Sequence, residues 1–220
     1  MVYRKTPAVQ ARLDAQSALI VQAATRVLSG AGFAGLSMAA VAAEAGVATG
    51  TVYRHFDGKS ELVSAVFRKV VAHEVAAVTA AAAAPDSRGS AVERVSAAVE
   101  TFAGRALKNP KLAYVLLVEP VDTAVDAERL HFRRAFAEAF ESAIADGVTR
   151  GELPGQDART SAAALVGAIG EVLAGPLSEA PHGESVVPEL VSFAMRALGV
   201  RADQSAAGAR ENQELSDADA

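Results

Sequence analysis

Residues 37–56 of this 220-residue chain read SMAAVAAEAGVATGTVYRHF, and they decide its fold. They predict a short helix over 38–44, a turn at 45–47 and a second short helix that begins after Ala48. Gly46 lies where a tight turn between helices requires a positive φ, which costs glycine little. The stretch therefore predicts a helix-turn-helix unit. Three valines are spaced to pack its two helices against each other at a steep angle: Val41, Val47 and Val52.

The second helix of this unit is expected to present small and polar side chains outward. Threonine offers both a hydroxyl and a methyl group, and glycine lets a backbone approach closely. Such a thin, hydrogen-bonding face fits a DNA major groove, where base edges offer donors, acceptors and thymine methyls. The alternative is an ordinary corner between two helices in a helical protein. The outward residues are Thr49, Gly50, Thr51, Tyr53 and Arg54.

The flanking residues 18–63 connect this unit to a known family. They contain Gly30-x-Gly32-Phe33, Ser37, Ala45-Gly46-Val47, Gly50-Thr51-Val52-Tyr53-Arg54-His55-Phe56, Lys59 and Leu62. This pattern resembles the N-terminal domain of TetR-family transcriptional regulators, and it does not extend to residues 80–220. Ala48 departs from the family, which often has Ser or Thr at the position that opens the recognition helix. The missing N-cap oxygen is expected to cost roughly 0.5–2 kcal/mol of helix stability.

The resemblance implies a three-helix DNA-binding domain over residues 1–60. Base edges are expected to meet Thr49, Gly50 and Thr51, while Tyr53 and His55 fit phosphate contacts, which position a protein without specifying sequence. Two further residues are expected to lie close to phosphates. Ser37 caps the second helix and can also donate to a phosphate, and Lys59 opens the next helix, where a cation and free N–H groups favour an anion. The alternative for Lys59 is an ordinary solvated lysine.

Charge is distributed unevenly along the chain. Residues 1–70 hold eight basic and four acidic side chains, a net charge of +4, and the whole chain carries −5, so residues 71–220 carry −9. A basic end on an acidic body orients a molecule on a polyanion. Arg4 and Lys5 form a short basic arm that either reaches a minor groove or is simply a disordered, charged terminus.

Composition predicts an all-α protein. A hydrophobic content of 51% is ample for a core, and β-branched alternation is scarce. A helical domain for regulation and dimerisation is expected over 61–200, and a disordered tail over 201–220, which is rich in Ala, Asp, Glu, Gln and Ser. The expected helices are 11–29, 60–82, 90–108, 110–119, 126–149, 157–175 and 186–198. The first carries one apolar stripe: Leu19, Ile20, Ala23, Ala24, Val27 and Leu28.

Several classes of site are not expected. The absence of cysteine excludes disulfides and thiolate chemistry, and four scattered histidines offer no metal site, so no metal or cofactor is expected. The N-terminus lacks the apolar segment of a signal peptide, and the apolar stretch 162–177 is expected to be too short for a bilayer. A cytoplasmic protein without a membrane partner follows. Two alternatives stay open: a helical scaffold without DNA binding, and a helical enzyme with His131 beside a carboxylate.

The helix expected over 157–175 is apolar nearly all round, which requires burial on most of its faces. In the resembling family the last two long helices form a two-fold, four-helix interface, which implies a homodimer here. Burial within one subunit is the alternative. The expected interface residues are Ala164, Gly167, Ile169, Phe193 and Leu198.

Three charged residues lie in apolar stretches: Arg105, Glu119 and Glu171. A buried charge must be paired or change its protonation, so these residues either form internal ion pairs or anchor a ligand. Phenylalanines at every fourth position from 132 to 140 are typical of a core stripe or of a cavity lining. The expected ligand-binding residues are Phe102, Arg105, Tyr114, Glu119, Phe132, Phe136 and Glu171. The resemblance implies a ligand-responsive repressor that binds a palindromic double-stranded DNA operator as a dimer, and the apolar residues of the second half predict that a small, mostly hydrophobic effector releases it.

Overall fold

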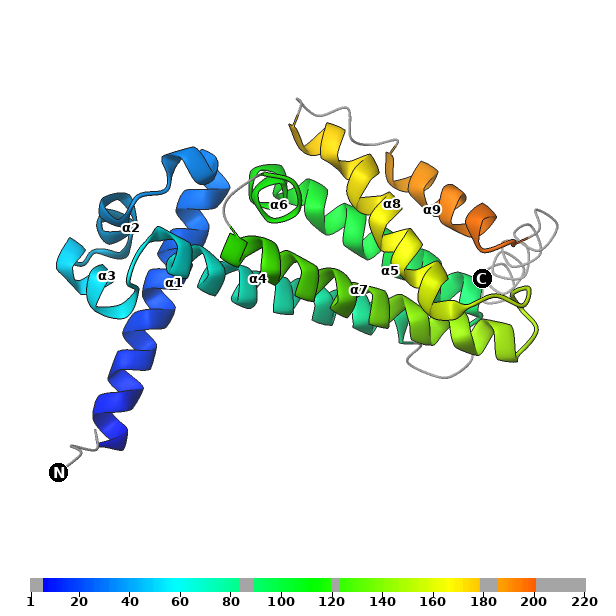
Figure 1. The fold of residues 1–220 in the computed structure, drawn as a ribbon, viewed down its shortest axis with the longest axis horizontal. Coiled ribbons are helices and arrows are strands. Elements are labelled where there is room, and N and C mark those ends of the chain that lie inside the picture. The colour runs from blue at the N-terminus through cyan, green and yellow to red at the C-terminus, as the bar shows by residue number, and fades with distance from the viewer. Residues whose placement is uncertain (1–5, 84–88, 120–122, 179–185, 201–220) are drawn as a thin grey trace, which may run out of the picture. The chain divides into compact units, whose positions relative to one another are not determined.

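The structure is a computed structural model that describes residues 6–83, 89–119, 123–178 and 186–200 (Figure 1). Every regular element within these ranges is an α-helix, so the predicted all-α class is confirmed. Arg4, Lys5 and the tail 201–220 lie outside the described residues. The helices are α1 (Pro7–Gly35), α2 (Met38–Ala45), α3 (Thr49–His55), α4 (Lys59–Ala82), α5 (Ala91–Lys108), α6 (Pro110–Leu117), α7 (Thr123–Thr149), α8 (Ala158–Ser178) and α9 (Val186–Ala197).

Helix α1 is longer at both ends than its apolar stripe predicted. It begins at Pro7 because Thr6 acts as N-cap, with its side-chain oxygen accepting from Val9 N at 3.4 Å, and because proline suits the first helical position. Gly32, at φ 65°, kinks the helix near its end. Leu19 is 59% exposed, so its assignment to the apolar core stripe was wrong, whereas Ile20 is fully buried.

The helix-turn-helix forms where residues 37–56 predicted it. The Ser37 side chain accepts a hydrogen bond from Ala40 N at 3.0 Å and caps α2. Gly46 ends α2 in the left-handed region, at φ 67° and ψ 33°, which confirms the predicted glycine turn. Val41 and Val52 are fully buried between the helices, and Val47 is half-buried.

Contacts divide the chain into two compact units. Unit 1 comprises Met1–Val75, Arg105–Phe132 and Leu173–Pro181, and unit 2 comprises Ala76–Gly104, Arg133–Val172 and His182–Ala220. The domain boundary predicted at residue 60 falls at the start of α4, which continues without interruption to Ala82. The division of the chain at that residue stays a prediction.

Unit 1 joins the helix-turn-helix to α6 through the end of α1. The Asn109 amide donates to Ser29 Oγ at 3.0 Å, and Lys111 Nζ donates to the Gly30 carbonyl at 2.7 Å. These bonds lie at the N-terminus of α6, so this end of α6 is fixed to the last turns of α1.

The other end of α6 is held by one side chain, Arg129 of α7. Its guanidinium donates to the carbonyls of Val115 at 2.7 Å and Leu116 at 3.1 Å, and also to the carbonyl of Glu119. The side chain is 14% exposed. A cation beside the last carbonyls of a helix satisfies their lone pairs and interacts favourably with the helix dipole.

Unit 2 contains the aromatic core of the second half. Phe102 of α5 and Phe136 of α7 stack with ring centroids 4.6 Å apart, and both are buried. Phe140 and Ile144 continue the same face of α7 and are fully buried. The predicted stripe along α7 is therefore buried, as both a core and a cavity lining require.

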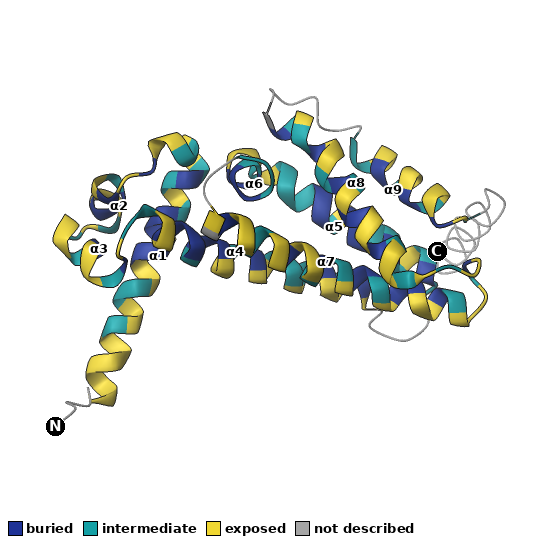
Figure 2. Cartoon of the chain, in the orientation of Figure 1, coloured by how far each residue is buried: buried dark blue, intermediate teal, exposed yellow. Residues whose placement is uncertain are grey.

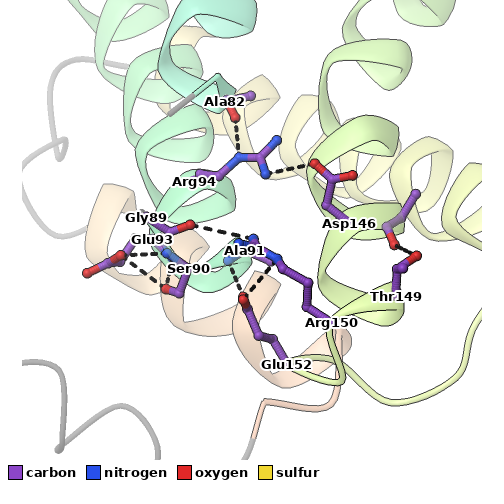
Figure 3. Close-up of polar contacts among 11 residues, drawn as sticks. Ala82, Gly89, Ser90, Ala91, Glu93, Arg94, Asp146, Thr149, Arg150 and Glu152 are labelled. Atoms are coloured by element: carbon purple, nitrogen blue, oxygen red, sulfur yellow. Dashed lines mark hydrogen bonds and ion pairs between the residues drawn. The ribbon is translucent and has the colours of Figure 1, made fainter. Parts of the chain in front are cut away.

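The start of α5 is fixed by reciprocal capping (Figure 3). Ser90 N donates to the Glu93 carboxylate at 2.8 Å, while Glu93 N donates to Ser90 Oγ at 3.2 Å. This is a capping box, which satisfies two N–H groups that the helix itself leaves without a partner. The Glu152 carboxylate accepts a further hydrogen bond from Ala91 N.

The last turn of α4 is held by Arg94 of α5, as Figure 3 also shows. Its guanidinium donates to the Ala82 carbonyl at 2.7 Å and pairs with Asp146 of α7 at 2.9 Å. One arginine therefore connects three helices at this end of unit 2.

Two described helices are long and apolar enough to cross a membrane by length and composition alone. They are α1 and the segment Ala158–Leu177 of α8. The expectation that the apolar stretch of α8 is too short was wrong, because the helix begins before residue 162. Ile20 and Leu28 of α1 and Ile169 and Leu173 of α8 are fully buried in the protein, as in core helices.

Candidate DNA-binding site

Figure 2 shows α3 as largely exposed, and most of the residues that the sequence predicted to face outward on it are exposed. Thr49 and Gly50 are exposed, Tyr53 is 53% exposed and Thr51 is half-buried. Val52 of the same helix is fully buried and anchors it. This short helix thus exposes the Thr49 hydroxyl, the Gly50 backbone and the Tyr53 phenol.

Helix α3 has little stabilisation of its own. It has seven residues, and its N-cap, Ala48, provides no side-chain hydrogen bond, as the sequence predicted. Its last turn carries Arg54 and His55, which suit the negative end of a helix dipole. The orientation of α3 must therefore come from tertiary contacts.

One such contact comes from Gln16 of α1, which sequence reasoning missed. Its amide oxygen lies 2.9 Å from His55 Nε2 and 3.3 Å from the guanidinium of Arg54. The residues are 38 and 39 positions apart, so no local pattern in the sequence could have indicated the contact.

Lys59 is half-buried at the start of α4 and contacts Phe33. Its ammonium donates to the Phe33 carbonyl at 2.9 Å and lies 3.6 Å from the centre of the Phe33 ring. Burial lowers the pKa of the Lys59 ammonium, and the Glu119 carboxylate opposes that effect. The side chain thus fixes the entry to α4, and a phosphate contact would have to share the ammonium with Phe33.

Ser37 is exposed at the N-terminus of α2. Its oxygen accepts the capping hydrogen bond, so its hydroxyl hydrogen remains able to donate. The structure is therefore compatible with both roles that the sequence gave this residue.

The three charges in the regulatory half have different surroundings. Arg105 forms a two-pronged ion pair with Glu74 of α4, and this hydrogen bonding raises the pKa of Arg105. This partner is neither Glu119 nor Glu171, the two glutamates that lie in apolar stretches of the sequence. Glu119 is half-buried, whereas Glu171 is exposed, so the expectation that Glu171 lies inside a buried helix was wrong.

The expected ligand residues divide between the two units. Arg105, Tyr114, Glu119 and Phe132 belong to unit 1, while Phe102, Phe136 and Glu171 belong to unit 2. The three phenylalanines are buried and Tyr114 is half-buried. Their role in binding a ligand stays a prediction.

Helix α8 has one buried and one exposed face. Ala164 and Gly167 are exposed, but Ile169 is fully buried inside the chain, which removes it from any surface that a partner could reach. Phe193 of α9 is 41% exposed, whereas Leu198, which directly follows α9, is buried. The expectation for Ile169 and Leu198 at a dimer interface was therefore wrong, because each already belongs to the core of unit 2.

His131 is exposed and contacts the edge of the Phe132 ring. Within the described ranges it has no carboxylate partner, so the geometry adds no support to the enzyme alternative. No group of three or more His, Asp or Glu residues in that part of the chain could hold a metal ion.

Two families match the sequence. The one described as bacterial regulatory proteins, tetR family, matches residues 20–66, and the one described as tetracyclin repressor-like, C-terminal domain, matches residues 88–174. Together they cover more than half of the chain. No protein with a curated function matches the sequence.

Solved structures share the fold over most of their length. A tetR-family regulatory protein from Rhodococcus RHA1 is 25% identical, covering 84% of this chain and 98% of its own, with a TM-score of 0.66. A TetR transcription regulator from Haloarcula marismortui is 19% identical, covering 84% and 97%, with a TM-score of 0.72. The regulator FadR from Bacillus subtilis, solved with stearoyl-CoA, is 18% identical, covering 83% and 95%, with a TM-score of 0.66.

Proposed function

Because the chain belongs to the TetR family of bacterial regulatory proteins, we propose that it is a ligand-responsive repressor that binds a palindromic operator through α3. The observation that carries this proposal is the outward surface of α3. Thr49, Gly50 and Tyr53 are exposed on this helix, whereas Val52 is fully buried. A core-anchored helix with a thin polar surface fits a major groove.

DNA selection tests the proposal directly. The purified protein is mixed with a pool of random duplexes, and the bound fraction is amplified and sequenced through several rounds. We expect enrichment of one two-fold symmetric site, whose half-sites lie about one helical turn or a multiple of it apart. Failure to enrich any sequence would favour the scaffold alternative.

We further propose that the chain forms a two-fold dimer through α8 and α9. The exposed surface of α8 includes Ala163, Ala164 and Gly167 together with Val172, which is 45% exposed. Small residues allow close approach of a second helix, and exposed Phe193 of α9 provides apolar area to bury. A two-fold dimer matches a palindromic operator by symmetry.

The effector is proposed to be a mostly apolar small molecule. The residues that favour this class are the stacked pair Phe102 and Phe136 and half-buried Tyr114. The Bacillus subtilis relative was solved with stearoyl-CoA, whose acyl chain is apolar, and that supports the same chemistry here. The effector releases DNA only if it binds the DNA-incompetent arrangement more tightly.

The proposed place of action is the cytoplasm, where regulators of this family in general act as soluble proteins. No cofactor or metal takes part in the proposed function. The chain's own residues provide the contacts to DNA and to the effector.

A further inference from the structure

Gln16 lies on α1, one helical turn before fully buried Ile20. Its backbone is therefore fixed by the core of the helix-turn-helix, while its half-buried side chain extends to the last turn of α3. There its single amide oxygen contacts both His55 Nε2 and the Arg54 guanidinium.

The chemistry of Arg54 determines which nitrogen of the His55 ring carries the hydrogen. A guanidinium can only donate hydrogen bonds, so the atom of Gln16 that faces it must be the amide oxygen. The same oxygen lies 2.9 Å from His55 Nε2, so this nitrogen must carry a hydrogen and donate it. In the neutral ring, Nδ1 is then the nitrogen without a hydrogen.

The free nitrogen of His55 is accessible to solvent. Nδ1 makes no hydrogen bond in the described part of the chain, where no buried side-chain nitrogen or oxygen lacks a partner. The imidazole is therefore held by one nitrogen and open at the other. This arrangement leaves the outer edge of the ring available to a ligand of α3.

Helix α3 needs a tertiary tether for its orientation. Seven residues without an N-cap side chain are too few for a stable isolated helix, and Val52 is its buried anchor. A single buried residue fixes the position of a helix but leaves it free to rotate or tilt. Gln16 adds a second fixed point, at the opposite end from Ala48.

We propose that Gln16 is a positioning residue for sequence-specific DNA binding, whose amide oxygen sets the orientation of α3 by holding His55 and Arg54. This inference rests on the proposed function, in which α3 enters the major groove. Gln16 acts through the recognition helix and requires no contact with DNA itself. Its loss affects sequence discrimination more than overall affinity for DNA.

The test compares two duplexes of equal length: the site that the wild-type protein selects from a random pool, and a scrambled version of it. The measured quantity is the ratio of the two dissociation constants. Gln16→Met keeps the length of the side chain but removes the acceptor, and we expect the ratio to fall about tenfold. Gln22→Met, an exposed glutamine on the same helix, is the matched control and should leave the ratio unchanged.

Gln16→Glu provides the rescue. A carboxylate still accepts from both donors, and its negative charge weakens binding to any phosphate backbone by a similar factor. We therefore expect lower affinity for both duplexes but a ratio close to that of the wild type. An unchanged ratio in Gln16→Met, or a Gln16→Glu ratio as low as that of Gln16→Met, would overturn the proposal.

A background variant tests whether Gln16 acts through its two partners. In a chain that carries Arg54→Met and His55→Leu, adding Gln16→Met should produce no further fall in the ratio. If Gln16→Met lowers the ratio in this background as much as it does in the wild-type protein, then Gln16 does not act through Arg54 and His55. Gln16→Ala serves in place of Gln16→Met if the latter does not fold, as judged by thermal unfolding.

One measurement needs no DNA. Nitrogen-15 chemical shifts of the neutral His55 ring report which nitrogen carries the hydrogen. We expect the hydrogen on Nε2. A hydrogen on Nδ1 alone would contradict the hydrogen bond from His55 to Gln16 and overturn the proposal. If the wild-type protein selects no duplex, the proposed function fails. If it selects one and Gln16→Met discriminates as well as the wild type, this inference alone fails.

Discussion

At the scale of single residues, Thr49 is the most direct candidate for reading sequence. It is exposed at the start of α3 and has no role in the core. Thr49→Ala should change the ranking of operator variants, because it removes one hydroxyl and one methyl from the groove-facing surface. Competition binding against single-base variants of the selected site measures the ranking. Thr79→Ala, an exposed threonine on α4, should leave the ranking unchanged.

Unlike Thr49, Lys59 should contribute to the stability of the fold and to binding of DNA of any sequence. Lys59→Ala removes the hydrogen bond to the Phe33 carbonyl and the contact with its ring, so the free energy of unfolding should fall by about 1–3 kcal/mol. Chemical denaturation measures this loss, and Lys69→Ala, an exposed lysine on the same helix, is the control.

Lys59→Ala should also weaken binding to all sequences alike. If the ammonium contacts a phosphate, the slope of log affinity against log salt decreases in magnitude by about one. A changed operator ranking in Lys59→Ala, combined with an unchanged ranking in Thr49→Ala, would reverse the assigned roles.

At the scale of helices, Arg129 connects α7 to the C-terminal end of α6. Arg129→Met leaves the carbonyls of Val115 and Leu116 without this donor and should lower the free energy of unfolding by about 2–3 kcal/mol. Arg129→Lys should recover little, because an ammonium lacks the planar fork that reaches several carbonyls at once. Denaturant titration provides the measurement. A comparable loss in Arg134→Met, an exposed arginine on α7, would show that the contacts of Arg129 are not the cause.

At the scale of the whole molecule, assembly depends on the exposed surface of α8. A Cβ added at Gly167 would meet nothing within 4 Å apart from its own stretch of helix, and the position is exposed, so Gly167→Arg should not disturb the fold of one subunit. In the proposed dimer the arginine places a charge without a partner in the closely packed interface between the subunits. We expect sedimentation as a monomer together with loss of operator binding.

Gly155→Arg is the control for the dimer, since position 155 also has free space and lies outside α8. It should sediment like the wild type. Ala164→Glu should repeat the effect of Gly167→Arg from a second exposed position on α8. A wild-type protein that sediments as a monomer at micromolar concentration would refute the dimer.

The effector response is also a property of the whole molecule. A panel of apolar compounds, including saturated acyl chains and small aromatics, is first screened for thermal stabilisation of the protein. A compound that stabilises it should lower operator affinity, and a tenfold loss corresponds to about 1.4 kcal/mol of coupling. Phe136→Leu should weaken this response while leaving binding without the compound nearly intact, provided that the variant folds. Leu130→Ala, an exposed apolar residue on the same helix, is the control.

The sequence by itself determined the helical class, the helix-turn-helix and the identity of its outward surface. Ser37, Gly46 and Ala48 act through their own backbone or through neighbours within four residues, so local chemistry predicts their roles. The approximate bounds of the later helices followed from Pro, Gly and apolar spacing for the same reason. The regular spacing of Phe132, Phe136 and Phe140 likewise predicted a single buried face.

Only the tertiary structure decided which partners meet across long separations. A helix as apolar as α8 does not reveal which side faces its own core, so Ile169 and Gly167 could not be distinguished from sequence. Arg105 could pair with any of several glutamates, and the packing against α4 selected Glu74. Gln16 lies nearly forty positions from His55, and its hydrogen bond exists only because both helices pack on a common core. Hydrogen bonds and burial depend on distances in space, which spacing along the chain determines only within an element.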